Sequence, residues 1–170
     1  MGIRRRDVLK AVAATAWAGF APDAYAHDRI LIPNEGKTAM TSRPLMTVRI
    51  AAAPPHKLGT VPHGIRSIVP VTGGDFEGPR LRGKVLPGGD DWLLLRPDGV
   101  LELDLRITLE TDDHALIHMT FQGLRHDLYF RTLPRYETSS EAYAFLNRII
   151  CVGVGEGRPG GAVHQIDEIL

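Results

Sequence analysis

Residues 101–111 read LELDLRITLET, and this run decides the fold class. Over nearly its whole length, apolar side chains alternate with charged or hydroxyl side chains. A period of two indicates a β-strand with one apolar face, because successive side chains of a strand point to opposite sides. The pair Asp-Asp at 112–113 then provides a turn, and residues 115–122 return with a similar alternation. We therefore expect a long antiparallel hairpin.

The chain from residue 44 onward continues as short apolar runs separated by turn residues. The sequence contains 18 Gly and 12 Pro, and these residues interrupt strands at turns. No helical segment separates consecutive strands, which excludes alternating βαβ units and favours an antiparallel barrel or sandwich. Closure into a barrel also removes exposed strand edges, so we predict one all-β antiparallel β-barrel at residues 44–170. Further strands are predicted at residues 45–52, 65–71, 81–86, 92–96, 149–154 and 163–170.

One short helix is predicted at residues 139–147. Thr138 and Glu141 have the spacing of a capping box, in which a hydroxyl and a carboxylate satisfy free amides of the first turn. Ala142, Leu146 and Ile150 follow at intervals of four residues. Such a stripe can pack on a sheet.

The start of the chain resembles an export signal. Residues 4–10 read RRRDVLK, close to the twin-arginine pattern in which Ser or Thr precedes Arg-Arg-x-Phe-Leu-Lys. Arg5 and Arg6 form the pair, and Val8 stands where the pattern usually has Phe. Residues 11–20 are apolar but too short to span a bilayer, as in the central part of a signal peptide.

A cleavage site of the A-x-A type follows at residues 24–26, which read AYA. We predict that residues 1–26 are a signal peptide and that residues 27–43 form a loose polar leader. The twin-arginine export machinery would then deliver a folded protein to the periplasm. The mature chain is expected to have no membrane span.

Charge and cysteine content exclude several functions. Residues 1–26 hold four basic and two acidic residues, so the remainder carries a net charge of −2 without a basic run. Nucleic-acid binding needs a basic surface and is not expected. Cys151 is the only cysteine, which excludes an intrachain disulfide and a cysteine metal cluster.

No metal site or cofactor is predicted. His114 and His118 are four residues apart, which on a strand is ~13 Å, too far for one metal ion. Residues 153–157 read GVGEG and suggest a phosphate loop. They lack the following helix and the Lys-Ser/Thr tail that such a loop requires.

Several ordered motifs follow one another along the mature chain. They are GIRSIVPV at 64–71, GDFEGP at 74–79, GGDDW at 88–92, Asp98-Gly99, DLR at 104–106, TDD at 111–113, FRT at 130–132 and residues 143–147. Together they closely resemble one family, the domain of unknown function 3237. The resemblance implies a calycin-like barrel and brings no settled activity. This chain departs from the family pattern at His114, where Gly is usual, and at Phe145, where Trp is frequent.

Charged residues and one Trp within these motifs are the candidate site. Asp104 and Arg106 lie two apart on one strand and share a face, so the guanidinium can hold the carboxylate ionised. Asp91 and Trp92 follow a Gly-Gly turn at a strand entrance, where barrels open to ligands. We predict catalytic roles for Asp104, Arg106 and Asp91, and ligand binding by Arg66, Trp92, Asp113 and Arg131.

The alternation alone leaves open which face of residues 101–111 lines the barrel. Soluble barrels ordinarily turn the apolar face inward, which would make Asp104 and Arg106 a solvated ion pair. The resemblance carries an Asp-x-Arg pair here, and the predicted helix needs an apolar surface to cover. We therefore expect Asp104 and Arg106 inside the barrel, with Arg66, Asp91 and Trp92 near the same mouth.

Three functional classes remain open at this point. The first is a cofactor-free acid–base enzyme of lyase, isomerase, cyclase or hydrolase type, acting on a small polar or aromatic compound. A carboxylate would transfer protons, and Arg66 or Arg106 would stabilise an oxyanion. The second is a periplasmic protein that binds such a molecule without reaction, because fold does not determine function. A third is a structural subunit that contacts copies of itself as a homo-oligomer.

The export signal gives the first testable prediction. Replacing Arg5 and Arg6 together by Lys should block export, because the machinery reads the arginine pair. Cell fractionation and mass spectrometry of the mature N-terminus, expected at or near His27, measure this. A full-length, functional protein that remains in the cytoplasm would contradict the assignment.

Overall fold

The structure, a computed structural model, describes residues 40–170. The predicted signal peptide at 1–26 and most of the predicted leader at 27–43 lie outside these residues. Ten strands and one short 3₁₀ helix follow in the order β1 (Ser42–Ala52), β2 (His56–Val61), β3 (Gly64–Glu77), β4 (Arg82–Val85), β5 (Asp90–Leu95), β6 (Leu101–Thr111), β7 (Leu116–His126), β8 (Tyr129–Glu137), η1 (Glu141–Arg148), β9 (Cys151–Arg158) and β10 (Gly161–Ile169).

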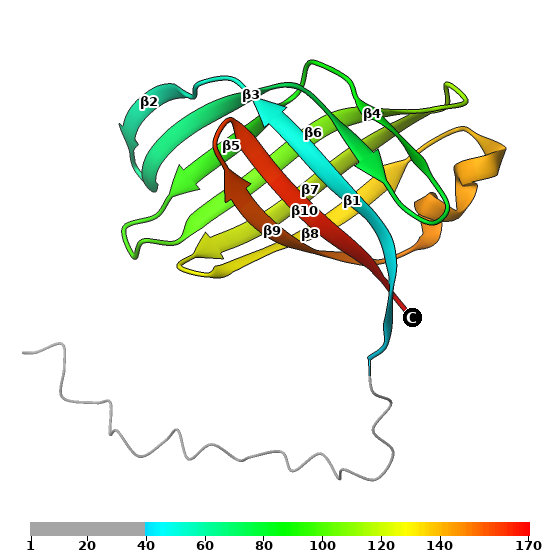
Figure 1. Cartoon of the computed structure of the whole chain (residues 1–170). Coiled ribbons are helices and arrows are strands. Elements are labelled where there is room, and N and C mark those ends of the chain that lie inside the picture. Colours follow the sequence, from blue (N-terminus) through cyan, green and yellow to red (C-terminus); the bar gives the residue numbers. More distant parts are fainter. Residues whose placement is uncertain (1–39) are drawn as a thin grey trace, which may run out of the picture. The chain divides into compact units, whose positions relative to one another are not determined.

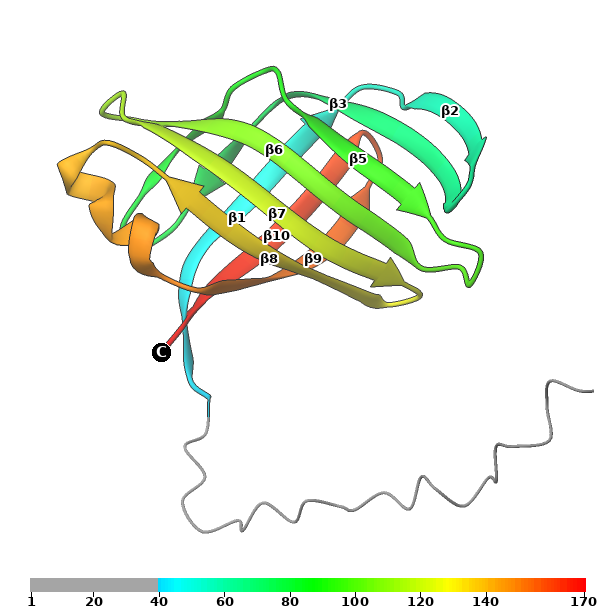
Figure 2. The same cartoon turned by 180° about the vertical axis from the view of Figure 1, so that it is seen from behind.

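All ten strands belong to one antiparallel sheet that closes on itself (Figures 1 and 2). Neighbouring strands run in the order β1, β10, β9, β8, β7, β6, and β6 then pairs with both β4 and β5. The long strand β3 pairs with β4 and β5 on one side. On its other side it pairs with β2 and with β1, and the β1–β3 pairing closes the barrel. The predicted antiparallel barrel with one short helix is confirmed.

The apolar face of the sheet forms the interior. In β6, Leu103, Leu105, Ile107 and Leu109 are buried, while the residues between them are more exposed. Burying these side chains removes apolar surface from water at roughly 25 cal/mol per Å². The predicted hairpin at residues 101–122 therefore forms part of the barrel wall, with its apolar face towards the interior. β7 contributes Ile117, Met119 and Phe121 to the same core, and β1 contributes Leu45, Val48 and Ile50.

The helix η1 lies at one end of the barrel, opposite the β2 hairpin (Figure 1). Leu146 of η1 is fully buried in the core, and Tyr143 and Ile149 pack against it. These three residues are three apart, which is the repeat of a 3₁₀ helix. This end is thus filled by side chains.

The predicted α-helical details of this segment are wrong. A capping box at Thr138 does not form, because its hydroxyl donates to the carbonyl of Leu116 at 2.8 Å and accepts from the N–H of Ser140. The predicted stripe with a repeat of four also fails at its end, since Ile150 is 73% exposed. A 3₁₀ turn brings every third residue to one face, so Ile149 packs inward in place of Ile150.

Two strands escaped the sequence analysis. β2 has little alternation and lies at the outer edge of β3. β8 alternates well, but Pro134 and the arginines at 131 and 135 obscure the pattern. β3 also extends well past the predicted end at Val71. Within residues 40–170, no helix is long and apolar enough to cross a membrane.

Leu146 and Ile150 provide a matched test of the helix. Leu146→Ala should lower the free energy of unfolding by about 2–5 kcal/mol, because it leaves a cavity beneath η1. Ile150→Ala should change it by less than about 0.5 kcal/mol, because Ile150 faces solvent. Urea unfolding measures both values, and equal losses would contradict the 3₁₀ packing.

Candidate functional site

The end of the barrel away from η1 contains a cavity of about 470 Å³. Its walls come from the end of β1 and the following loop, the middle of β3, and the strands β5 to β10. The lining is mainly aliphatic and aromatic, with Leu103, Phe121 and Phe130 among the larger side chains. Ligand pockets are typically lined by apolar side chains together with a few polar groups. Three lining residues can carry charge: Asp91, Arg125 and His164.

Asp91 reaches the cavity from β5. Its strand neighbour in β6 is Leu105, whose side chain is buried in the core. Trp92 and Leu93, which follow Asp91, do not pair with β6. The backbone N–H of Asp104 in β6 instead donates to Asp91 Oδ1 at 3.1 Å. Burial raises the pKa of Asp91 to about 6, partly offset by that hydrogen bond. The carboxylate is thus ionised at neutral pH and can be protonated there at little cost.

His164 reaches the same cavity from β10 and is almost completely buried. Its ring lies 4.9 Å from that of Phe121 and 5.0 Å, edge to face, from that of Phe130. Burial lowers the pKa of His164 to about 4, so the imidazole is neutral at pH 7. Among residues 40–170, its Nδ1 has no hydrogen-bond partner. A neutral imidazole offers one donor and one acceptor.

These two groups suit proton transfer. A carboxylate with a pKa near the working pH can accept a proton and return it. A neutral imidazole N–H can stabilise negative charge that develops on an oxygen, and an apolar surrounding strengthens that hydrogen bond. The cavity therefore combines a base with a hydrogen-bond donor among mainly apolar side chains.

Glycines of β9 make room for the side chains beside this cavity. Residues 153–157 alternate glycine with larger residues, and the glycines face inward. A Cβ at Gly155 would lie 2.7 Å from the ring of Phe130, and one at Gly157 would lie 2.8 Å from Arg125 Nη1. The run that suggested a phosphate loop is a strand whose missing side chains make space for its neighbours.

The expected inward orientation of Asp104 and Arg106 is wrong. Both side chains lie on the outer wall, with 35% and 56% exposed, and Arg106 Nη2 lies 3.3 Å from Asp104 Oδ2. The leucines of β6 occupy the interior because burying them releases more free energy than η1 could recover by covering an outer apolar face. Such an exposed pair contributes ~1 kcal/mol or less to stability.

Four predicted site residues meet on this outer wall. Arg66, Trp92, Asp104 and Arg131 line a groove of about 770 Å³ over β3 and β5 to β9. Arg66 Nη1 donates to the carbonyl oxygen of Trp92 at 3.1 Å, and Trp92 is 41% exposed. Arg66 and Trp92 thus lie together, as predicted, but on the outside. Of the three residues predicted at the barrel mouth, Arg66, Asp91 and Trp92, only Asp91 lines the cavity.

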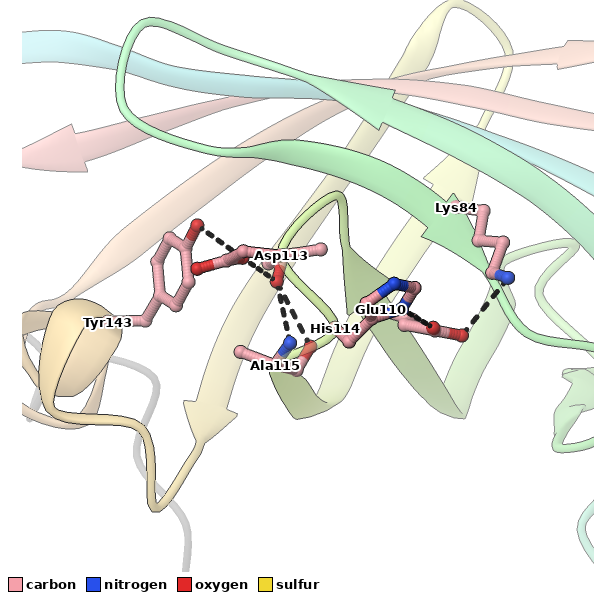
Figure 3. Close-up of polar contacts among 7 residues, drawn as sticks. Lys84, Glu110, Asp113, His114, Ala115 and Tyr143 are labelled. Atoms are coloured by element: carbon pink, nitrogen blue, oxygen red, sulfur yellow. Dashed lines mark hydrogen bonds and ion pairs between the residues drawn. The ribbon is translucent and has the colours of Figure 1, made fainter.

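Asp113 lies at the opposite end, in the β6–β7 turn (Figure 3). It accepts hydrogen bonds from the hydroxyls of Thr111 and Tyr143, which holds η1 against the turn and keeps the pKa of Asp113 low. His114 adopts a left-handed backbone with φ of 64° and contacts Glu110 Oε1 through Nδ1 at 2.7 Å. The geometry here is that of a structural turn.

The sequence analysis missed His164 and Arg125. His164 lies in β10 between Val163 and Ile166, where alternation would have placed it inward with Ile166. A polar residue on an apolar face was the available signal. Arg125 follows Phe121 and Gly123 on the inward face of β7 and carried no such signal, because strand ends are commonly polar.

Known proteins resemble most of the described chain. The family described as "Protein of unknown function (DUF3237)" matches residues 40–127 and 125–169. A Rhodopseudomonas palustris protein, described as a UPF0311 protein, is 30% identical over 130 residues, which span 66% of this chain and 85% of that one.

Solved structures share the barrel. A β-barrel-like protein from Acinetobacter baumannii has 31% identity and a TM-score of 0.75, covering 80% of this chain and 99% of that one. A crystal structure described as an enzyme from Penicillium herquei has 21% identity and a TM-score of 0.67, covering 79% and 98%. At that identity it shows the fold alone.

The opposite pKa shifts of Asp91 and His164 predict how stability depends on pH. Between pH 4 and 6 the folded chain keeps a proton on Asp91 that the unfolded chain has released. The contribution of Asp91 to the free energy of unfolding therefore falls as the pH rises. Below pH 6.5 His164 becomes protonated in the unfolded chain but not in the folded chain. The contribution of His164 to the free energy of unfolding therefore falls as the pH decreases towards 4. The two effects oppose each other over the same range.

Single substitutions should separate them. Asp91→Asn should make the free energy of unfolding fall more steeply than in the wild type between pH 6.5 and 4. His164→Gln should make it fall less or rise. Each change should amount to about 2–3 kcal/mol, measured by urea unfolding at several pH values. Curves parallel to the wild type in both variants would contradict the burial of these groups.

Proposed function

Because this chain belongs to the DUF3237 family, described only as proteins of unknown function, we propose its function from the barrel cavity. The protein is a cofactor-free acid–base enzyme that acts on a small, largely apolar or aromatic molecule. One observation carries this proposal: Asp91 and a neutral His164 line the same, mainly apolar cavity.

The reaction class follows from what these groups can do. Asp91 removes a proton from carbon beside a carbonyl group, and the electron pair of the broken C–H bond moves to the carbonyl oxygen. The N–H of His164 stabilises this developing enolate. Asp91, now protonated, returns the proton to the same or another atom. Isomerase, lyase and cyclase reactions of carbonyl compounds can proceed through such a step.

A second candidate is a binding protein without catalysis. The predominance of aliphatic and aromatic side chains in the lining favours it, because burial of apolar surface suffices for binding. A structural role as a homo-oligomer subunit would instead use the outer groove, where Trp92, Leu124 and Leu133 are exposed.

The place of action belongs to the same proposal. Arg5, Arg6 and the A-x-A sequence at 24–26 support export by the twin-arginine machinery to the periplasm. Export of the folded barrel would present the cavity to small molecules outside the cytoplasm.

Exchange of carbon-bound protons tests the chemistry directly. 2-Tetralone is a flat aromatic ketone whose α-protons exchange for deuterium in D₂O, and NMR follows the exchange. The wild-type protein should accelerate it beyond the same concentration of acetate. Asp91→Asn should lower the protein-dependent rate by about 100-fold or more, because the base is lost.

Two further aspartates serve as controls. Asp112→Asn should leave the rate unchanged, because Asp112 pairs with Arg82 in an exposed position on the β6–β7 turn. Asp104→Asn should move the rate's dependence on pH towards lower pH, because the charge of Asp104 helps to raise the pKa of Asp91. Exchange that survives Asp91→Asn would refute the enzyme. Binding of 2-tetralone without exchange would favour the binding protein.

A further inference from the structure

Arg125 is the basic side chain that lines the cavity, and it lies at the mouth. It comes from the end of β7, opposite Leu101 at the start of β6. Its guanidinium carbon lies 5.4 Å from the ring centre of Phe130, within the range of a cation–π interaction. Phe130 thereby holds the positive charge over the opening.

This guanidinium is free to bind a ligand. Within residues 40–170, Arg125 makes no ion pair and no side-chain hydrogen bond, whereas Arg43, Arg80 and Arg96 are paired with carboxylates. Gly157 lies beneath it and provides the space it occupies, since a Cβ there would be 2.8 Å from Nη1 and 3.1 Å from Nη2. The missing side chain at Gly157 of β9 thus gives the guanidinium of Arg125 space at the mouth of the cavity, where no carboxylate of residues 40–170 pairs with it.

The register of β6 sets how far this cation lies from the proposed base. Arg125 pairs with Leu101, and Asp91 pairs with Leu105. Four residues of strand separate these levels, which corresponds to ~13 Å between backbone positions. The cation therefore lies at the entrance, and the carboxylate lies deeper in the barrel.

We infer that the molecule bound in the cavity carries an anionic group, a carboxylate, sulfonate or phosphate, which Arg125 binds at the mouth. The remainder of the molecule is apolar or aromatic and extends inward between Phe121 and Leu103 towards Asp91. This inference rests on the proposed function of the cavity. A guanidinium suits such a group, because its planar N–H donors match two oxygens of one anion.

The orientation has a chemical consequence. An anion next to Asp91 would raise the free energy of the ionised carboxylate through charge repulsion. Arg125 at the mouth keeps the substrate's charge away from the base and turns the uncharged, reactive end inward. The same arrangement would disfavour a cationic substrate.

A pair of fluorescent probes with one aromatic body tests this inference. 1-Anilinonaphthalene-8-sulfonate and N-phenyl-1-naphthylamine differ only in the sulfonate, and both fluoresce in apolar surroundings. The wild-type protein should bind the sulfonate form roughly tenfold more tightly, as expected for one charge-assisted hydrogen-bonded pair. Arg125→Gln should abolish this preference and leave the affinity for the neutral probe unchanged.

Two substitutions separate position from charge. Gly157→Ala keeps the net charge but places a methyl group against the guanidinium, so it should also reduce the preference for the sulfonate. Arg131→Gln removes one positive charge from the outer groove and should leave the preference intact. Ala162→Trp fills the cavity and should abolish the binding of both probes.

The outcomes are distinct. A sulfonate preference that survives Arg125→Gln, one that Arg131→Gln reduces equally, or probe binding that survives Ala162→Trp would overturn the inference. None of these results bears on proton transfer by Asp91, which the deuterium exchange of 2-tetralone measures separately. If the wild-type protein does not accelerate the exchange of 2-tetralone but does prefer the sulfonate probe, the proposed enzyme is rejected and the anion site at Arg125 is retained.

Discussion

The pairing of β1 with β3 closes the sheet, and the remaining features of the molecule depend on this closure. An open sheet of ten strands would expose two edges and leave its apolar face in water. Closure gives every strand an inner and an outer face. It also requires that whatever points inward be apolar, hydrogen-bonded or neutral, because water is largely excluded there.

The two ends of the barrel use this interior differently. At one end, η1 covers the opening, and Leu146 with large side chains from β6 and β7 fills the space. At the other end, Gly157 of β9 and small residues of β1 and β10 line the cavity. The molecule therefore has one end filled by core side chains and one end that holds a cavity.

Burial acts on the two ionisable groups of the cavity with opposite results. It disfavours whichever form is charged, so the pKa of Asp91 rises and that of His164 falls. The result is an easily protonated carboxylate and a neutral imidazole that line the same cavity. On the outer wall, Asp104 and Arg106 remain close to water, so their pairing has little energetic effect.

The sequence by itself determined the all-β class and eight of the ten strands, but not β2 or β8. The alternation at 101–111 specified a strand with one apolar face, and Gly and Pro specified the turns, because both are local properties of backbone and side chain. Alternation also established that Asp104 and Arg106 share a face. It could not choose the inner face, because that choice depends on which other strands cover it.

Only the tertiary structure brought the cavity together. Asp91, Arg125 and His164 come from β5, β7 and β10, and no spacing in the chain relates them. Closure through residues far apart in sequence places them around one space, and the glycines of 153–157 take on meaning only beside Phe130 and Arg125. The physical reason is that burial, which sets the protonation of Asp91 and His164, is a property of all surrounding strands together.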